Sequence, residues 1–207
     1  MQECLPQGFT AIGQIAGRLQ FGHVDEETGL WTPYGSNHND PQYSWGMIAA
    51  QCIGLKNPAY AVNAMYLEYA NVASPSSTVA PPTVTRATGL SYYNGLAYTP
   101  DRDFLRVPLT NPPGLDIQPG YEPYFTAGIS GNLLHFFAMS NGSLGVLGKT
   151  FSSGVNSLVY GAALVATPVY ADRSQDVILA IGYLPISQQT IKPPSSQAGV
   201  QWDVFFA

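Results

Sequence analysis

The sequence predicts an all-β fold: an antiparallel β-sandwich, jelly-roll-like, with an extended N-terminal arm. Short apolar segments recur at even spacing in the second half of the chain, and Gly, Pro, Ser and Asn cluster between them, as expected for strands joined by turns. No segment has the length and 3.6-residue period that would indicate a secure helix. About eight strand candidates can be counted, and eight strands in two sheets form a jelly roll, whereas seven would fit other sandwiches equally well.

The chain is expected to divide into an N-terminal arm or loop region, residues 1–45, and a β-sandwich domain, residues 46–207. Within the first part only FTAIGQIAGRLQ looks ordered. The stretch 23–45 holds turn formers, two Trp and the densest acids of the chain. It is too long for an ordinary connection, so we expect it to wrap a surface or reach a neighbour.

The first strand candidates of the sandwich lie in the middle of the chain. Residues 46–55 fit a strand or a short helix, because periodicity does not separate the two over so few residues. Residues 60–72 predict a long strand, and residues 103–109 an edge strand, since Pro108 donates no ladder hydrogen bond. The faces expected for 60–72 are Ala61, Met65, Leu67 and Tyr69 on one side and Tyr60, Val62, Tyr66 and Glu68 on the other.

The remaining strands are predicted at 132–140, 157–170, 176–184 and 200–207. In 157–170 both faces are apolar, although a strand of an antiparallel sheet usually has one wet face. Either both faces are covered within the domain, or the face with the small residues packs on a partner. The expected faces are Leu158, Tyr160, Ala162, Leu164 and Ala166 on one side and Val159, Gly161, Ala163 and Val165 on the other.

Composition limits the classes of partner. Only 10% of the 207 residues are charged and the net charge is −5, against about 25% charged in typical soluble domains. Such a surface suits a chain packed against neighbours, and without a basic stripe we expect no nucleic-acid partner. No apolar run reaches the ~18 residues of a membrane helix, so no membrane contact is expected. The start lacks signal-peptide features, and Cys4 and Cys52 are expected to be free thiols in a reducing cytosol.

Candidate catalytic motifs are incomplete. Gly148-Lys149-Thr150 lacks the upstream Gly of a phosphate loop and leads into a strand. Ser130 and Ser143 lack the Gly-x-Ser-x-Gly elbow of serine hydrolases. His135 lies in an apolar strand, where we expect a packed imidazole. Two strand carboxylates, Glu68 and Asp103, are a weak match to a glycosidase pair.

Two further groups of residues are candidates for a binding site. The first is the only metal-like cluster, and its spacing matches no known ligand pattern, so a turn rich in acids is expected. The second is a sugar-stacking platform of Tyr92, Tyr93 and Tyr98, or of Trp31 and Tyr34, although aromatics in a β-domain need no ligand to explain them. We therefore assign no catalytic, cofactor-binding or metal-binding residue. The cluster consists of His23, Asp25, Glu26, Glu27, His38 and Asp40.

Several segments resemble virion structural proteins of tailed bacteriophages, most of all the small β-sandwich proteins that decorate or cement capsids. The resemblance is one of style and order of segments over most of residues 45–207. The segments are MYLEYANV (65–72), GLSYYNGLAY (89–98), DFLRVPL (103–109), LHFFAMSNGSLGVLGKTFS (134–152), NSLVYGAALVATPVYADRSQDVILAIGYL (156–184) and VQWDVFF (200–206).

The resemblance implies a non-catalytic protein without a cofactor, present as repeated copies on a virion assembled in the host cytoplasm. Its partners would be the major capsid protein and copies of itself, in a homo-oligomer that is often a trimer. The arm 23–45 and the Tyr-rich loops 89–98 and 117–125 would supply the contacts. The alternatives are a collar, tail or head-fibre component, and a carbohydrate-binding or host-attachment module.

Overall fold

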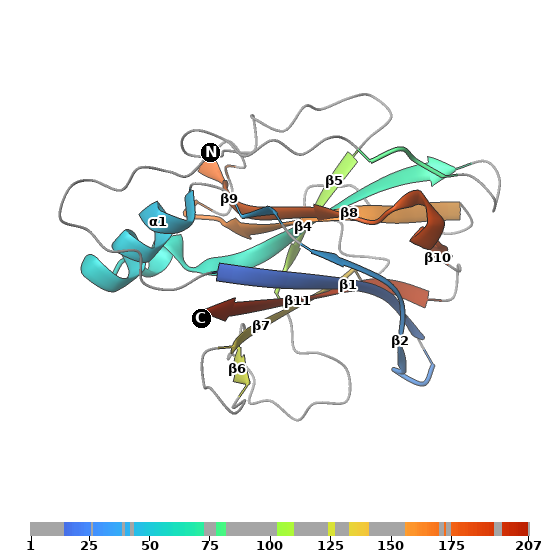
Figure 1. Cartoon of the computed structure of the whole chain (residues 1–207), viewed down its shortest axis with the longest axis horizontal. Helices are drawn as coiled ribbons and strands as arrows, with labels where there is room; N and C mark the ends of the chain where they lie inside the picture. The colour runs from blue at the N-terminus through green and yellow to red at the C-terminus, as the bar shows by residue number, and fades with distance from the viewer. Residues whose placement is uncertain are drawn as a thin grey trace.

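Two antiparallel sheets packed face to face form the protein, as seen edge-on in Figure 1. The predicted all-β sandwich is confirmed, while the strand order does not confirm a jelly roll. The computed structural model describes residues 15–25, 27–38, 40–41, 44–72, 78–81, 103–109, 124–126, 133–140, 156–169, 172, 175–192 and 196–206.

The first sheet has the order β2-β1-β11-β7-β6 and the second β3-β9-β8-β4-β5, with β10 also pairing β8. The strands of the first sheet are β1 (Ile15–Asp25), β2 (Trp31–His38), β6 (Tyr124–Thr126), β7 (Leu133–Ser140) and β11 (Ser196–Phe206). Those of the second are β3 (Asp40–Pro41), β4 (Val62–Val72), β5 (Asp103–Pro108), β8 (Asn156–Ala166), β9 (Val177–Tyr183) and β10 (Ile191–Lys192).

The expected arm of residues 1–45 is corrected over its second part. β1 pairs with β11 along its whole length, from Ile15↔Phe206 to Asp25↔Ser196. β2 pairs with β1 in the first sheet, and β3 pairs with β9 in the second. Leu19 and Phe21 are fully buried, so this segment supplies core as well as backbone pairing. Removing residues 1–45 would delete an inner strand of the first sheet rather than a detachable arm. Residues 1–14 lie outside the described part of the chain.

The sheets are also linked along both sides. The chain passes from β2 in the first sheet directly to β3, which pairs with β9 in the second. On that side Asn37 Nδ2 donates to the Tyr183 carbonyl at 2.5 Å. On the other side, Leu109 follows β5 and forms a bridge to Ala138 of β7. These links hold the two layers in one fixed arrangement.

Residues 46–55, for which the sequence left strand and helix open, are helical. α1 (Ser44–Ala49) continues into a π-helical turn, η1 (Ala50–Gly54). Ile48 is buried and anchors α1 on the sandwich. Two short 3₁₀ turns, η2 (Pro58–Tyr60) and η5 (Ile186–Gln188), complete the helical elements of the described residues.

Both faces of β8 are buried within the chain, which decides between the two alternatives left open for this strand. The register steps from Glu68↔Gly161 to Tyr69↔Val159, so Tyr160 is an extra residue that forms a β-bulge. A bulge shifts the alternation of the strand by one position. Leu158 and Tyr160 therefore lie on the outer side with Ala163 and Val165, and not with Ala162, Leu164 and Ala166 as expected.

A second bulge corrects the faces of β4 in the same way. The register steps from Val62↔Ala166 to Ala64↔Val165 and leaves Asn63 as the extra residue. Val62 therefore joins the core between the sheets, where the sequence pattern had placed it on the side of Tyr66 and Glu68. The expected alternation holds from Met65 to Tyr69.

Candidate functional site

The side chain of Asp25 holds a turn together in this acid-rich stretch. Asp25 Oδ1 accepts hydrogen bonds from the Thr28 amide at 2.7 Å, the Thr28 hydroxyl at 2.7 Å and the Glu27 amide at 3.1 Å. These bonds, that of the Thr28 hydroxyl first, lower the pKa of Asp25. Gly29 adopts a φ of +67°, which closes the turn without strain. The Asp25 carboxylate thus has a structural role at the hairpin tip.

The other members of that cluster do not gather around Asp25. His23 packs against Tyr34 with the rings tilted by 44° and their centroids 4.6 Å apart, and His38 ends β2. Asp40 lies in β3, in the other sheet. Glu26 lies outside the described residues, and the part of the chain that is described contains no group of three or more His, Cys, Asp or Glu side chains arranged to hold a metal.

Glu68 and Asp103 are not cross-strand partners. Between β4 and β5 the register pairs Glu68 with Phe104 and Asp103 with Tyr69. Glu68 is 1% exposed and accepts a hydrogen bond from the Tyr160 hydroxyl at 2.6 Å. A carboxylate so enclosed has no access to a polysaccharide, so its role in the fold is structural.

The structure contains a second buried carboxylate that no sequence motif indicates. Asp176, just before β9, is fully buried and accepts a hydrogen bond from the Tyr66 hydroxyl. Both Tyr–carboxylate pairs lie on the outer side of the second sheet. Tyr66 and Glu68 alternate visibly along the sequence, but nothing local indicates that this side of the strand is buried.

His135 is the packed imidazole that the sequence predicts. It is 7% exposed, and its Nδ1 lies 2.5 Å from Oδ1 of Asp203, its cross-strand partner on β11. This contact between the two side chains links the outer sides of β7 and β11. Ser130, Ser143 and the segment 148–150 lie outside the described residues.

Trp31 and Tyr34 do not form the shared stacking platform that was one of the alternatives in the sequence. Tyr34 packs against the core, its hydroxyl donates to the Val159 carbonyl at 3.4 Å, and burial raises the pKa of its phenol. Trp31 lies on the opposite, outer side of the first sheet, next to Phe137. Residues three apart in a strand point to opposite sides, which separates the two rings. Tyr92, Tyr93 and Tyr98 lie outside the described residues.

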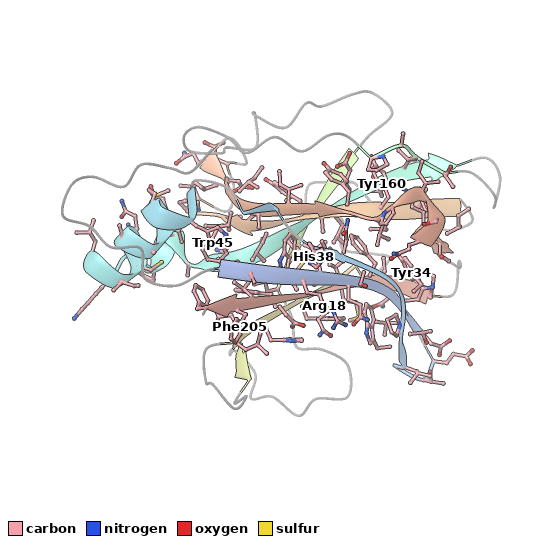
Figure 2. The ribbon with its side chains drawn as sticks, in the orientation of Figure 1. Arg18, Tyr34, His38, Trp45, Tyr160 and Phe205 are labelled. Carbon is pink, nitrogen blue, oxygen red and sulfur yellow. The ribbon has the colours of Figure 1, made fainter. Side chains whose placement is uncertain are left out.

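Three of the exposed large apolar side chains of the described residues belong to elements at one end of the sandwich. Ile53 is 80% exposed, Leu55 is 72% exposed and Phe205 is 37% exposed. We call these three residues the apolar end. Figure 1 places α1 and the C-terminus at the same end of the molecule, and Figure 2 shows Trp45 and Phe205 there.

The backbone that presents Ile53 and Leu55 is held in place. The Asn57 amide donates to the Gln51 carbonyl at 3.0 Å, and the Leu55 amide to the Ala50 carbonyl at 3.3 Å. Lys56 has a φ of +49°, an uncommon conformation for a residue other than Gly. Trp45 packs edge-on against Phe206 at 6.0 Å, which joins α1 to the end of β11. The two aliphatic side chains are therefore presented by an ordered element.

Exposure of these side chains leaves apolar area in water. Burial of one Ile or Leu side chain contributes about 1.5–3 kcal/mol relative to full exposure. A partner that covers Ile53 and Leu55 together gains most of that contribution without ordering the backbone first. The arrangement is suited to a protein contact. Cys52, which directly precedes Ile53 in the chain, is a free thiol that lies 3.9 Å from the Asn57 carbonyl.

Comparisons with known proteins found no match for this chain among family models, curated proteins or solved structures. Within the described residues, no helix has the length and hydropathy needed to span a membrane.

Proposed function

We propose that this chain is a non-catalytic structural protein that works through contacts with other protein copies, and that its setting is the capsid of a tailed bacteriophage. The apolar end carries the first part of the proposal. The setting is supported by the resemblance of its segments to capsid decoration and cement proteins. In this role the partners are the major capsid protein and further copies of the chain.

The chemistry of the surface supports a contact role. Stable protein interfaces bury upwards of ~1,000 Å² and have apolar or aromatic residues at the centre with few charges. Ile53, Leu55 and Phe205 supply such a centre, and only 10% of the residues of the chain are charged. Backbone hydrogen bonds hold the segment that carries Ile53 and Leu55, so little conformational entropy is lost when a partner binds.

The proposal predicts that charge at the apolar end prevents docking. Substitutions Ile53→Asp and Leu55→Asp place carboxylates where an apolar partner surface would close over them, which is unfavourable without a compensating charge. We expect at least a tenfold weaker binding, ~1.4 kcal/mol, when the purified variant is added back to virions stripped of the protein. Co-sedimentation of the chain with the particles gives the occupancy.

The control is Ile186→Asp, which introduces one carboxylate, as each of the two substitutions does singly, at an isoleucine 49% exposed on η5, outside the apolar end. It should bind as the unmodified chain does. Circular dichroism establishes that each variant is folded. Equal occupancy for the folded double variant and the control would overturn the assignment of the apolar end as the docking surface.

A further inference from the structure

The outer side of the first sheet carries one large aromatic side chain seated over two glycines. Gly22 of β1 and Gly199 of β11 are register partners. A Cβ atom at Gly22 would lie 2.5 Å from Cη2 of Trp31, and one at Gly199 would lie 2.4 Å from Cζ3 of the same ring. Any other residue at either position would displace the indole from the sheet.

Phe137 fixes the indole from the side. The rings of Trp31 and Phe137 meet at 80° with centroids 5.3 Å apart. Phe137 is 1% exposed, whereas Trp31 stays partly exposed. Glycine within a strand costs about 0.5–1 kcal/mol relative to alanine, and it often marks a place that a ligand approaches closely. The fold thus accepts two such glycines to hold in position an indole that it does not fully bury.

On the same side of the sheet, the next two pairs of residues beyond Gly22 and Gly199 are polar. Gln20 lies opposite Gln201, and Arg18 lies opposite Asp203. All four alternate with core residues, so they share the outer side with Trp31. Figure 2 labels Arg18 on β1. Gly22 and Arg18 are four residues apart, about 13 Å at the usual rise of a strand.

The carboxylate of Asp203 positions the side chain of Gln201. The amide nitrogen of Gln201 lies 3.4 Å from Oδ2 of Asp203. The contact between Oδ1 of Asp203 and Nδ1 of His135, at 2.5 Å, holds that carboxylate in place. Trp31 and Gln201 therefore each have a neighbour that positions the side chain before a ligand arrives, Phe137 for the indole and Asp203 for the amide.

We propose that Trp31, together with Gln20 and Gln201, forms a binding site for a neutral oligosaccharide. The C–H face of a pyranose carries partial positive charge and matches the electron-rich face of an indole. Side-chain amides both donate and accept hydrogen bonds, as sugar hydroxyls do. One guanidinium and one carboxylate at the far end of the row leave no net charge to select a polyanion.

The experiment uses the full chain, labelled with a fluorophore, on a printed array of bacterial cell-surface oligosaccharides. The oligosaccharide with the strongest signal is then titrated by calorimetry. We expect saturable binding, at least a tenfold loss of affinity for Trp31→Ala and a smaller loss for Gln201→Ala. Leu30→Ala removes a neighbouring side chain that is 64% exposed in the β1–β2 turn and should bind as the unmodified chain does.

A fluorescence titration with the same oligosaccharide keeps the test valid if Trp31→Ala fails to fold. Binding should change the tryptophan emission of the unmodified chain and of Trp45→Phe, but not that of Trp31→Phe. The proposal is overturned if no oligosaccharide binds, if folded Trp31 variants bind unchanged, or if an array of proline-rich peptides binds where the sugars do not. Because the assay contains no virion, its result is independent of the capsid proposal.

Discussion

At the scale of single residues, Glu68 and Asp176 show how the fold keeps two acids away from water. Each is at most 1% exposed and each accepts a hydrogen bond from a tyrosine hydroxyl, of Tyr160 and Tyr66 respectively. A buried carboxylate is strongly unfavourable unless it is hydrogen-bonded. These two tyrosines are therefore part of what makes the buried outer side of the second sheet stable.

The substitution Tyr160→Phe tests this role. It keeps the ring and removes the hydroxyl that donates to Glu68, so we expect the free energy of unfolding to fall by about 1–3 kcal/mol. Denaturant unfolding measures the change. Glu68→Gln and the double variant complete a cycle, and we expect the double variant to lose less stability than the sum of the two single variants. Strictly additive losses would contradict a coupled pair.

At the scale of elements, the β1–β2 turn depends on the ionised form of Asp25. Its hydrogen bonds to Thr28 and Glu27 lower the pKa of Asp25 below the usual value of about 3.9. The ionised carboxylate therefore stabilises the folded turn. Its contribution is complete above about pH 5 and is lost as the pH falls through the lowered pKa of the folded state.

Nuclear magnetic resonance measures this directly. Protonation of Asp25 should weaken the hydrogen bond from the Thr28 amide, so exchange of that amide should quicken, after correction for the intrinsic rate, as the pH falls through the lowered pKa. Asp25→Asn retains an acceptor oxygen but does not ionise, and its turn should show no such dependence. A carboxyl that titrates at the ordinary aspartate value would contradict the account.

The strands of the second half were predictable, because alternation is a local signal that survives in a single sequence. Which strands pair with one another could not be predicted. β1 and β11 pair across nearly the whole chain, and no local pattern in IAGRLQF indicates the strand beside it. The bulges at Asn63 and Tyr160 depend on register, so the face swaps they cause were equally hidden.

The candidate sites follow the same logic. GMIAAQCIGL is apolar and looks buried in sequence. Ile48 and Cys52 of this segment face the core, however, and Ile53 and Leu55 are left exposed. The sequence shows Trp31 as an aromatic residue, but nothing in it links Gly22 and Gly199 to the indole. They meet beneath the indole only after β1 and β11 pair.

At the scale of the whole molecule, a rigid sandwich carries two separate surfaces, the apolar end and the side with Trp31. The sandwich is linked along both of its sides by the passage from β2 to β3 and by the bridge from Leu109 to Ala138. The apolar end lies at one end of this rigid body, and Trp31 lies on the outer side of the first sheet. A virion protein with these two surfaces would dock on the shell through the first and meet host glycans through the second.

The central claim is that the chain is a shell component, and quantitative mass spectrometry of gradient-purified particles from the source culture tests it most directly. The account predicts the chain in hundreds of copies per particle, in fixed ratio to the major capsid protein. About a dozen copies would instead assign it to the collar or tail. Its absence from the particles would contradict the virion assignment.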